Sequence, residues 1–381
     1  MKGVFQVAKL FGIPVQIHWS FLLIFAWVFY VGSEESLDWW EMGAYALLVM
    51  ALFLCVVLHE FGHALTARRY GVETRDIILS PIGGIARLDR LPEKPWQEFM
   101  VAIAGPLVNV AISAALAVVP MLSSGENRRQ FYHYFYALFY PDSNTFTLNV
   151  SPVYEFLFLL IIVNIVLALF NMLPAFPMDG GRVLRALLST RLGRLKATRI
   201  AAYIGQGFAV LLAGYGIWSV SPITALIGVF VFMAAASEYR MAKMEGLLDY
   251  FTIGDVARRQ FTRLYAADPV DTALDQYRQG MEKDFLVFDE WQNLMGVLPE
   301  KELIAVANGG AENSRLSIGQ LVSSGYEALL VSDPLKAVLP GMQWKHFQLL
   351  PVFDKGKLVG VVDQNAVNSF IRLQRKPGWR K

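Results

Sequence analysis

Residues 58–63, Leu58-His59-Glu60-Phe61-Gly62-His63, lie inside a strongly apolar stretch that runs from Met42 to Ala67. Ionisable side chains at the depth of a bilayer are costly, and they usually mark a functional site. On a helix, His59 and His63 lie on one face, where two imidazoles can bind one Zn²⁺ ion while Glu60 stands beside them. The sequence therefore predicts a metal site, and hydrolytic chemistry, within a membrane helix.

The same three side chains also have a structural interpretation. Polar residues buried between membrane helices hydrogen-bond to one another, so His59 and His63 can be packing residues with Glu60 as an ion-pair partner. We favour the metal site, because three side chains that are costly to place inside a membrane occur together at the spacing that zinc requires.

The chain divides by composition into an apolar part and a soluble part. Its 381 residues are 55% hydrophobic, with a mean hydropathy of +0.41 and a net charge of +2. Long apolar runs continue up to residue 245, and the remainder has the charge density of a soluble protein. We expect a membrane domain at 1–245 and two soluble repeats at 246–309 and 310–381. The small net charge indicates no nucleic-acid partner.

Six apolar segments are each close to the roughly 20 residues that a spanning helix needs. They are Val15–Gly32, Met42–Ala67, Phe99–Leu122, Val153–Leu173, Ala197–Val220 and Pro222–Ala242. The loops after the second, fourth and sixth are rich in Arg and Lys, whereas the loop after the first is acidic. Because positive loops stay in the cytoplasm, we expect a multi-pass α-helical protein of the cell membrane with both termini cytoplasmic.

A zinc hydrolase needs a third protein ligand and leaves the fourth position to water or substrate. Asp179 is the best candidate, because it follows the fourth apolar segment and two prolines, Pro174 and Pro177. Prolines stop a regular helix, and irregular backbone at membrane depth is tolerated where it lines a wet cavity. The alternative is that Asp179 caps a helix beginning at Gly180.

Three motifs together resemble the site-2 proteases, a family of intramembrane zinc metalloproteases. The motifs are His59–His63, Gly105-Pro106-Leu107-Val108-Asn109 and Asn171–Gly181, in this order and spacing. The N-terminal segment Gly12–Ser20 and the tail from Gly246 are similar to the branch with six spans and cytoplasmic CBS repeats, which includes the sporulation protease type.

The resemblance implies that His59, His63 and Asp179 bind one Zn²⁺ ion and that Glu60 is the general base. It also implies a membrane-spanning protein substrate, of the anti-sigma-factor or transcription-factor-precursor type, cleaved within its transmembrane segment. Two alternatives stay open. One is a channel or transporter regulated by CBS domains, with His59, Glu60 and Asp179 as its ion path. The other is an inactive homologue that only holds its client.

Five further residues are candidates for binding substrate. Asn109 and Asn171 are amides at membrane depth, where they can hydrogen-bond an extended substrate or join two helices. His18 lies at the cytoplasmic end of the first apolar segment and can approach the site or serve the membrane interface. Gly83 and Gly84 belong to a predicted turn beside the site.

The turn is part of a predicted β-hairpin from Thr74 to Leu88. Two short apolar runs flank Pro81-Ile82-Gly83-Gly84, which has the composition of a turn. An open strand edge can pair with an unwound substrate and present the scissile bond in extended form. We therefore expect this hairpin to lie beside the metal site.

The tail contains an internal repeat. Ile253–Ala257 recurs as Ile318–Val322, and Asp268-Pro269 recurs as Asp333-Pro334. A period of about 65 residues indicates tandem copies of one α/β unit. The repeat resembles a CBS pair, a module that commonly binds adenine nucleotides and that can join chains into a homodimer or higher oligomer.

The nucleotide-binding pattern of such modules is incomplete in both copies. In the first copy Pro299 stands where Ser or Thr is usual, and the following acid is Glu302; in the second copy the two positions hold Asp363 and Ala366. Adenine-nucleotide sensing and a pairing or scaffolding role are therefore both open.

Overall fold

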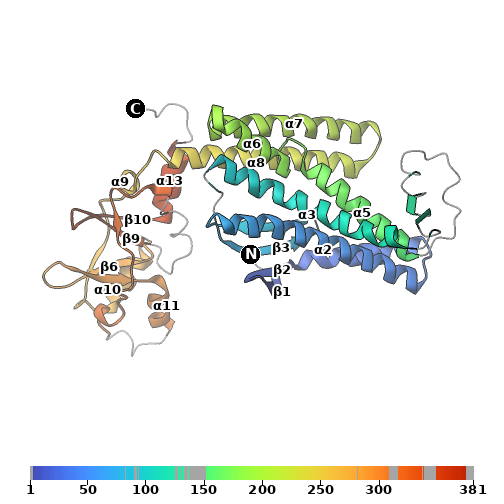
Figure 1. Cartoon of the computed structure of the whole chain (residues 1–381). Coiled ribbons are helices and arrows are strands. Elements are labelled where there is room, and N and C mark those ends of the chain that lie inside the picture. Colours follow the sequence, from blue (N-terminus) through green and yellow to red (C-terminus); the bar gives the residue numbers. More distant parts are fainter. Residues whose placement is uncertain are drawn as a thin grey trace. The chain divides into compact units, whose positions relative to one another are not determined.

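The structure is a computed structural model. It describes residues 3–374, except 82, 90, 91, 93, 124, 126, 127, 130, 133–135, 137–151, 281, 309–315, 337 and 339–348. The chain forms two compact units, Met1–Ala242 and Lys243–Lys381. The first is a helical bundle with a small sheet, and the second is a mixed α/β body (Figure 1).

The first unit is dominated by long helices. Its described helices are α1 (Leu22–Glu34), α2 (Trp39–Arg69), α3 (Pro95–Leu122), α5 (Pro152–Asn171), α6 (Asp179–Leu192), α7 (Arg194–Trp218) and α8 (Pro222–Leu248), of which α8 continues a few residues into the second unit. Among the described residues, α2, α3, α5, α7 and α8 are long and apolar enough to cross a membrane. The prediction of a multi-pass α-helical membrane protein is confirmed.

The first predicted span, Val15–Gly32, begins too early. Residues Ile13–His18 form strand β2, which a short 3-10 helix (Trp19–Phe21) joins to α1. With 13 residues, α1 is shorter than the five spanning candidates. Ile13 and Val15 are buried while Pro14 and Gln16 are less so, the period-two pattern of a strand. A prediction from hydropathy alone does not separate this strand from the helix that follows it.

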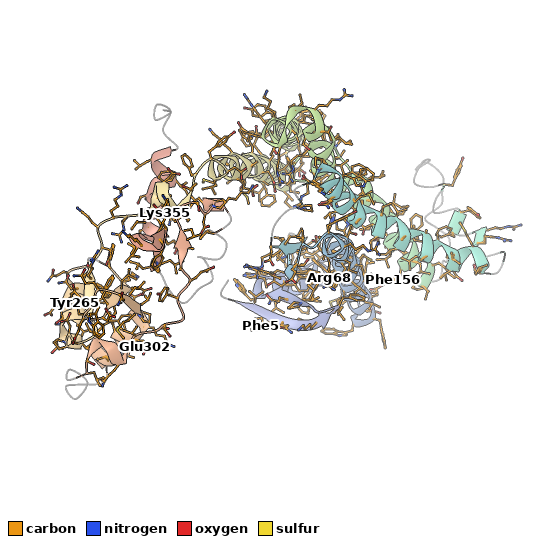
Figure 2. All side chains as sticks on the ribbon, turned by 60° about the vertical axis from the view of Figure 1, so that its left-hand side comes forward. Phe5, Arg68, Phe156, Tyr265, Glu302 and Lys355 are labelled. Carbon is orange, nitrogen blue, oxygen red and sulfur yellow. The ribbon has the colours of Figure 1, made fainter. Side chains whose placement is uncertain are left out.

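A four-stranded sheet packs beside α2. Its strands are β1 (Val4–Leu10), β2, β3 (Thr74–Ser80) and β4 (Gly83–Leu88), in the order β1-β2-β3-β4. The hairpin β3–β4 is confirmed, whereas β1 and β2 were not predicted as strands; β2 pairs parallel with β3. Figure 2 shows the sheet alongside α2, with Phe5 on β1 and Arg68 near the end of α2.

The sheet is held to α2 by a small apolar core. Ile13, Val15 and Ile77 from the sheet are buried against Val57 and Phe61 of α2. Phe61 lies between the two histidines of the motif, so the burial of its side chain against the sheet fixes the rotation of this turn of α2 about its axis. The sheet therefore helps to decide which way His59 and His63 face.

The second unit contains two similar sheets. The first has strands β5 (Arg263–Tyr265), β6 (Phe285–Phe288) and β7 (Leu294–Leu298), with helices α10 (Val270–Arg278) and α11 (Glu300–Asn308). The second has β8 (Leu329–Leu330), β9 (Leu349–Asp354) and β10 (Lys357–Asp363), with α9 (Ile253–Val256) and α13 (Gln364–Gln374). In each sheet the first pair of strands is parallel and the second is antiparallel.

The two copies exchange their opening segments. The Ile253 N–H donates to Asp333 O at 2.9 Å, and the Ile318 N–H donates to Asp268 O at 2.9 Å. Ile253 is buried in the core of the second sheet and Ile318 in the core of the first. The predicted tandem α/β repeat is therefore confirmed, although each copy completes the other and neither core is formed by one copy alone.

Candidate metal centre

Three side chains from distant parts of the chain meet inside the helical bundle. His59 and His63 lie on α2, and Asp179 is the first residue of α6. The His59 Nε2–His63 Nε2 distance is 3.1 Å, and Asp179 Oδ2 lies 3.2 Å from the first nitrogen and 3.1 Å from the second. All three residues are less than 10% exposed. The structure therefore brings together the three ligands that the sequence proposed.

The donor set fits a zinc ion. Nitrogen and oxygen ligands about 2.0–2.1 Å from zinc at tetrahedral angles lie about 3.3 Å from one another, close to the separations found here. Two imidazoles and one carboxylate leave a fourth position free, as in catalytic zinc sites. Gly105 of α3 faces this space, because a Cβ at that position would overlap with His63 Nε2 and His59 Nε2. Residue 105 thus has to lack a side chain for the cluster to hold an ion.

Neighbouring groups orient the ligands and the general-base candidate. The His63 Nδ1–H donates to the carbonyl oxygen of Val101 at 2.7 Å, which leaves Nε2 unprotonated and free to bind metal. The Ala86 N–H on β4 donates to Glu60 Oε2 at 3.0 Å. His59 Nδ1 is buried and has no hydrogen-bond partner among the described residues. The sheet therefore contacts the motif through Glu60.

Close backbone packing brings α3 and β4 to α2. A Cβ on Gly62 would overlap with the carbonyl oxygen of Ala104 on α3. A Cβ on Gly84 would press on the side chains of Glu60 and Val56. These two glycines let the neighbouring elements approach the motif within distances that a side chain would prevent.

Asp179 is delivered by an irregular segment between α5 and α6. The helix α5 ends at Asn171, and tight backbone bonds follow, from Ala175 N to Leu173 O and from Met178 N to Ala175 O. Met178 is the N-cap of α6, and Asp179 occupies the first helical position, so the alternative in which Asp179 caps the helix is wrong. Its carboxylate instead faces the two imidazoles.

The surroundings of Asp179 favour its charged form. Arg182 Nη1 lies 4.0 Å from Asp179 Oδ1, and its positive charge stabilises the ionised carboxylate. An ionised carboxylate is the form that binds a metal ion.

The five substrate-binding candidates have different surroundings. Asn109 lies on α3 one turn beyond Gly105; it is buried, and its Oδ1 has no partner among the described residues. Asn171 is the last residue of α5. Gly83 has a φ of +132°, which favours glycine, and Gly84 packs on Glu60. His18 caps the short 3-10 helix by accepting from Ser20 N, which gives it a local structural role.

Some residues at the site were not singled out by sequence. Val101 and Ala86 act through backbone atoms, and a sequence carries no signal for such contacts. Arg185 and Glu98 form a buried ion pair behind the Asp179 segment. In the sequence each is a single charge within an amphipathic region, and nothing marks the two residues as partners. Gly105 belongs to one of the three motifs, and its lack of a Cβ is the physical reason for its place there.

In the second copy of the tail repeat, Asp363 stands where the nucleotide-binding pattern has Ser or Thr, and its carboxylate has partners within the tail. Asp363 Oδ1 accepts from Ala366 N at 2.6 Å, which caps α13, and Asp363 Oδ2 lies 2.7 Å from Arg258 Nη2. Arg258 also donates to Glu282 Oε1 at 3.0 Å. The acid at this position therefore serves the fold of the tail.

Comparison with known proteins gives this geometry a family. The sequence model of peptidase family M50 matches residues 47–213. Zinc metalloprotease MJ0392 of Methanocaldococcus jannaschii is 35% identical over 256 residues, which are 67% of this chain and 66% of that protein. “Putative zinc metalloprotease sll0528” of Synechocystis sp. is 29% identical over 388 residues, 96% of this chain and 95% of that protein.

Two solved structures are similar to parts of the chain. The site-2 protease from Methanocaldococcus jannaschii is 35% identical, covering 62% of this chain and 95% of that one, with a TM-score of 0.45. CBSX2, solved in complex with AMP, is 22% identical and covers 33% of this chain and 99% of that one, with a TM-score of 0.29.

The helical unit is thus that of a membrane-embedded zinc metalloprotease, whose cofactor Zn²⁺ matches the donor set described above. The chain belongs to peptidase family M50, the site-2 protease family.

Proposed function

We propose that this protein hydrolyses a peptide bond within a transmembrane segment of a membrane-tethered regulatory protein. The observation that carries the proposal is the cluster of His59, His63 and Asp179, with Glu60 beside it, in a bundle of helices apolar enough to span a membrane. A zinc ion held by these three ligands would polarise the substrate carbonyl and acidify a bound water molecule.

Glu60 is the proposed general base. It follows His59 on α2, and the Ala86 N–H orients its carboxylate. In this role Glu60 accepts the proton of the attacking water and returns it to the leaving amine. Asn109, one turn beyond Gly105 on α3, has an unpartnered buried amide oxygen among the described residues, and we propose that it accepts a hydrogen bond from the substrate backbone. Asn171 is a second candidate for such contacts.

We propose that the substrate pairs with β4 as an added strand. Peptide bonds in a helix are shielded by their own hydrogen bonds, so the segment has to unwind before attack. β4 is an edge strand of the four-stranded sheet, and its Ala86 N–H contacts Glu60. A peptide that pairs alongside β4, the strand that begins with Gly83 and Gly84, would run past the general base Glu60.

The loop charges support a topology with both termini in the cytoplasm of a plasma-membrane protein. The released product would then be cytoplasmic, which suits an anti-sigma factor or a transcription-factor precursor as substrate. Reporter fusions at the two termini test the topology.

We propose that the tail joins two copies of the chain through its repeats; cross-linking and light scattering of the purified full chain test this.

Substitution of Glu60 tests the central proposal. Glu60→Gln keeps the size of the side chain but cannot take a proton, so cleavage of a co-expressed tethered substrate should fall about 10²- to 10⁴-fold while zinc stays bound. Glu155→Gln, the same change on an exposed acid of α5, is the matched control and should leave cleavage unchanged. If Glu60→Gln cleaves at the normal rate, Glu60 is not the base. Transport activity without proteolysis would instead favour a channel.

Disulfide capture tests the added strand. In a Cys55→Ser background, Ile85→Cys on β4 should cross-link to a single cysteine placed near the scissile bond of the substrate. Val7→Cys lies on β1, the opposite edge of the sheet, with a similar exposure of 63% against 60% for Ile85. Equal cross-linking at both edges, or cross-linking only at Val7, would contradict the proposal.

A further inference from the structure

A buried arginine lies directly behind the segment that delivers Asp179. Arg185, on the second turn of α6, is 2% exposed. Its Nε–H donates to Glu98 Oε1 of α3 at 2.6 Å, and its Nη1 lies 3.7 Å from Glu238 Oε2 of α8. One guanidinium therefore joins the helix that begins with Asp179 to two of the spanning candidates.

The same guanidinium contacts the segment itself. The Cζ atom of Arg185 lies 5.0 Å from the centre of the Phe176 ring, within cation–π distance. Phe176 is fully buried and stands three residues before Asp179. Arg185 thus packs on a side chain of the segment that leads to Asp179.

Phe176 is also fixed by α7. Its N–H donates to the carbonyl oxygen of Ala201 at 3.3 Å, and a Cβ on Gly205 would overlap with the Phe176 carbonyl oxygen. Gly181 also packs closely on the peptide between Ala175 and Phe176. The ring contact with Arg185 is the side-chain part of this arrangement, and the close glycine contacts are its backbone part.

Stability alone gives a weak reason for such a group. Removing a guanidinium and a carboxylate from water costs several kcal/mol per ion, and well-packed apolar side chains often replace a buried ion pair without loss. A planar, multidentate cation does supply fixed geometry, because its donors have only a few productive directions. A ligand that has to meet two imidazoles within about 0.5 Å of its productive position needs such geometry.

We propose that Arg185, acting through Phe176, is a positioning residue for the metal ligand Asp179. The proposal rests on the assignment of Asp179 as a zinc ligand. Arg185 touches neither the substrate nor the ion in this role; it sets the geometry of the third ligand from outside the donor set, as hydrogen-bonded partners do at other metal sites.

Metal binding by the purified full chain tests the proposal. The pair Glu98→Gln with Arg185→Gln removes both charges of the buried ion pair together, and it leaves the carboxylate of Glu238, whose side chain is 27% exposed, without this cation. We expect zinc affinity, measured by chelator competition, to fall about 10- to 100-fold. The visible absorption of the Co²⁺-substituted protein should also change, because it reports ligand geometry. At saturating zinc, kcat should fall while KM stays constant.

Phe176→Leu is the second variant, because it leaves the Arg185–Glu98 pair intact and removes only the ring contact. It should weaken zinc binding and alter the Co²⁺ spectrum in the same direction. Arg199→Gln is the matched control: Arg199 lies 5.3 Å over the Tyr203 ring, both on α7, so the same kind of contact is lost outside the Asp179 segment. Its zinc affinity should equal that of the unchanged protein.

An unchanged zinc affinity and Co²⁺ spectrum in Phe176→Leu would overturn the proposal, whether or not the double variant folds. Asp179→Ala separates this outcome from failure of the proposed function. If Asp179→Ala still binds zinc with full affinity, the ligand assignment is wrong. If it loses zinc while Phe176→Leu binds normally, the ligand stands and only the positioning role is wrong.

Discussion

Two acids of this chain stand at the start of a helix and have opposite surroundings. Asp179 opens α6 and faces two imidazoles, whereas Asp363 precedes α13, caps it and pairs with Arg258. The first carboxylate is available to a metal ion, and the second is committed to the fold. The position of an acid in a helix therefore does not decide its function; the partners that the fold brings to it do.

Replacing each acid by alanine should show the largest difference. Asp179→Ala removes one of the three proposed zinc ligands, so zinc affinity should fall by more than about 10²-fold, beyond the loss expected for outer groups, and cleavage should fall with it. Asp363→Ala should leave both unchanged and cost about 1 kcal/mol through the lost cap. Metal analysis and cleavage of a co-expressed substrate measure the first pair of effects. Loss of zinc in Asp363→Ala would break the comparison.

Two tightly packed glycines extend the contrast. Gly105→Ala would place a methyl group against His63 Nε2 and His59 Nε2, in the space of the ion, so zinc affinity should fall at least about tenfold. Gly360→Ala on β10 would press on the carbonyl oxygen of Arg258 and destabilise the tail by about 1–3 kcal/mol. Equilibrium dialysis with zinc and thermal unfolding of the full chain measure the two effects. Normal zinc binding in Gly105→Ala would remove residue 105 from the site.

Removal of zinc should act on one unit only. A ligand present at 1,000 times its Kd stabilises the folded state by about 4 kcal/mol. After chelation we therefore expect faster hydrogen exchange in α2 and α6, with exchange in β6 and β9 unchanged. Restoring zinc should reverse the effect. Faster exchange in both units would show that the tail also depends on the metal.

Arg258→Ala should give the smallest effect on activity. It leaves Glu282, whose side chain is 5% exposed, without its cation, and the expected loss in the unfolding free energy of the tail is about 1–3 kcal/mol, reduced because Arg258 is itself 38% exposed. Zinc affinity should not change. Arg278→Ala removes an exposed ion pair with Asp275 and is the matched control, with a loss below about 1 kcal/mol.

Sequence was sufficient for those parts of the protein that rest on spacing. His59 and His63 are one helical turn apart in any helix, and the prolines before Asp179 indicated a break that the structure contains. The β3–β4 hairpin followed from its turn residues. These features are local, so a linear pattern can carry them.

The remaining features depend on contacts across the chain. Strand β2 was joined to the first span, because an apolar run has the same composition in a strand and a helix, and its partner β3 lies some 60 residues later. The backbone donors and acceptors at Ala86 and Val101 carry no side-chain signal. Likewise, the exchange of Ile253 and Ile318 between the copies of the tail repeat depends on long-range packing.

The length of α2 has a consequence for how water reaches the site. At 1.5 Å per residue its 31 residues span about 46 Å, against about 30 Å for the hydrocarbon layer of a bilayer. The capping box of Asp38 and Glu41 fixes one end, and Arg68 and Arg69 close the other. His59 lies ten residues, or about 15 Å, before Arg69. His59 therefore lies in the half of α2 that ends at the charged Arg68 and Arg69, so water has a shorter path to the site from that end of the helix than from the other.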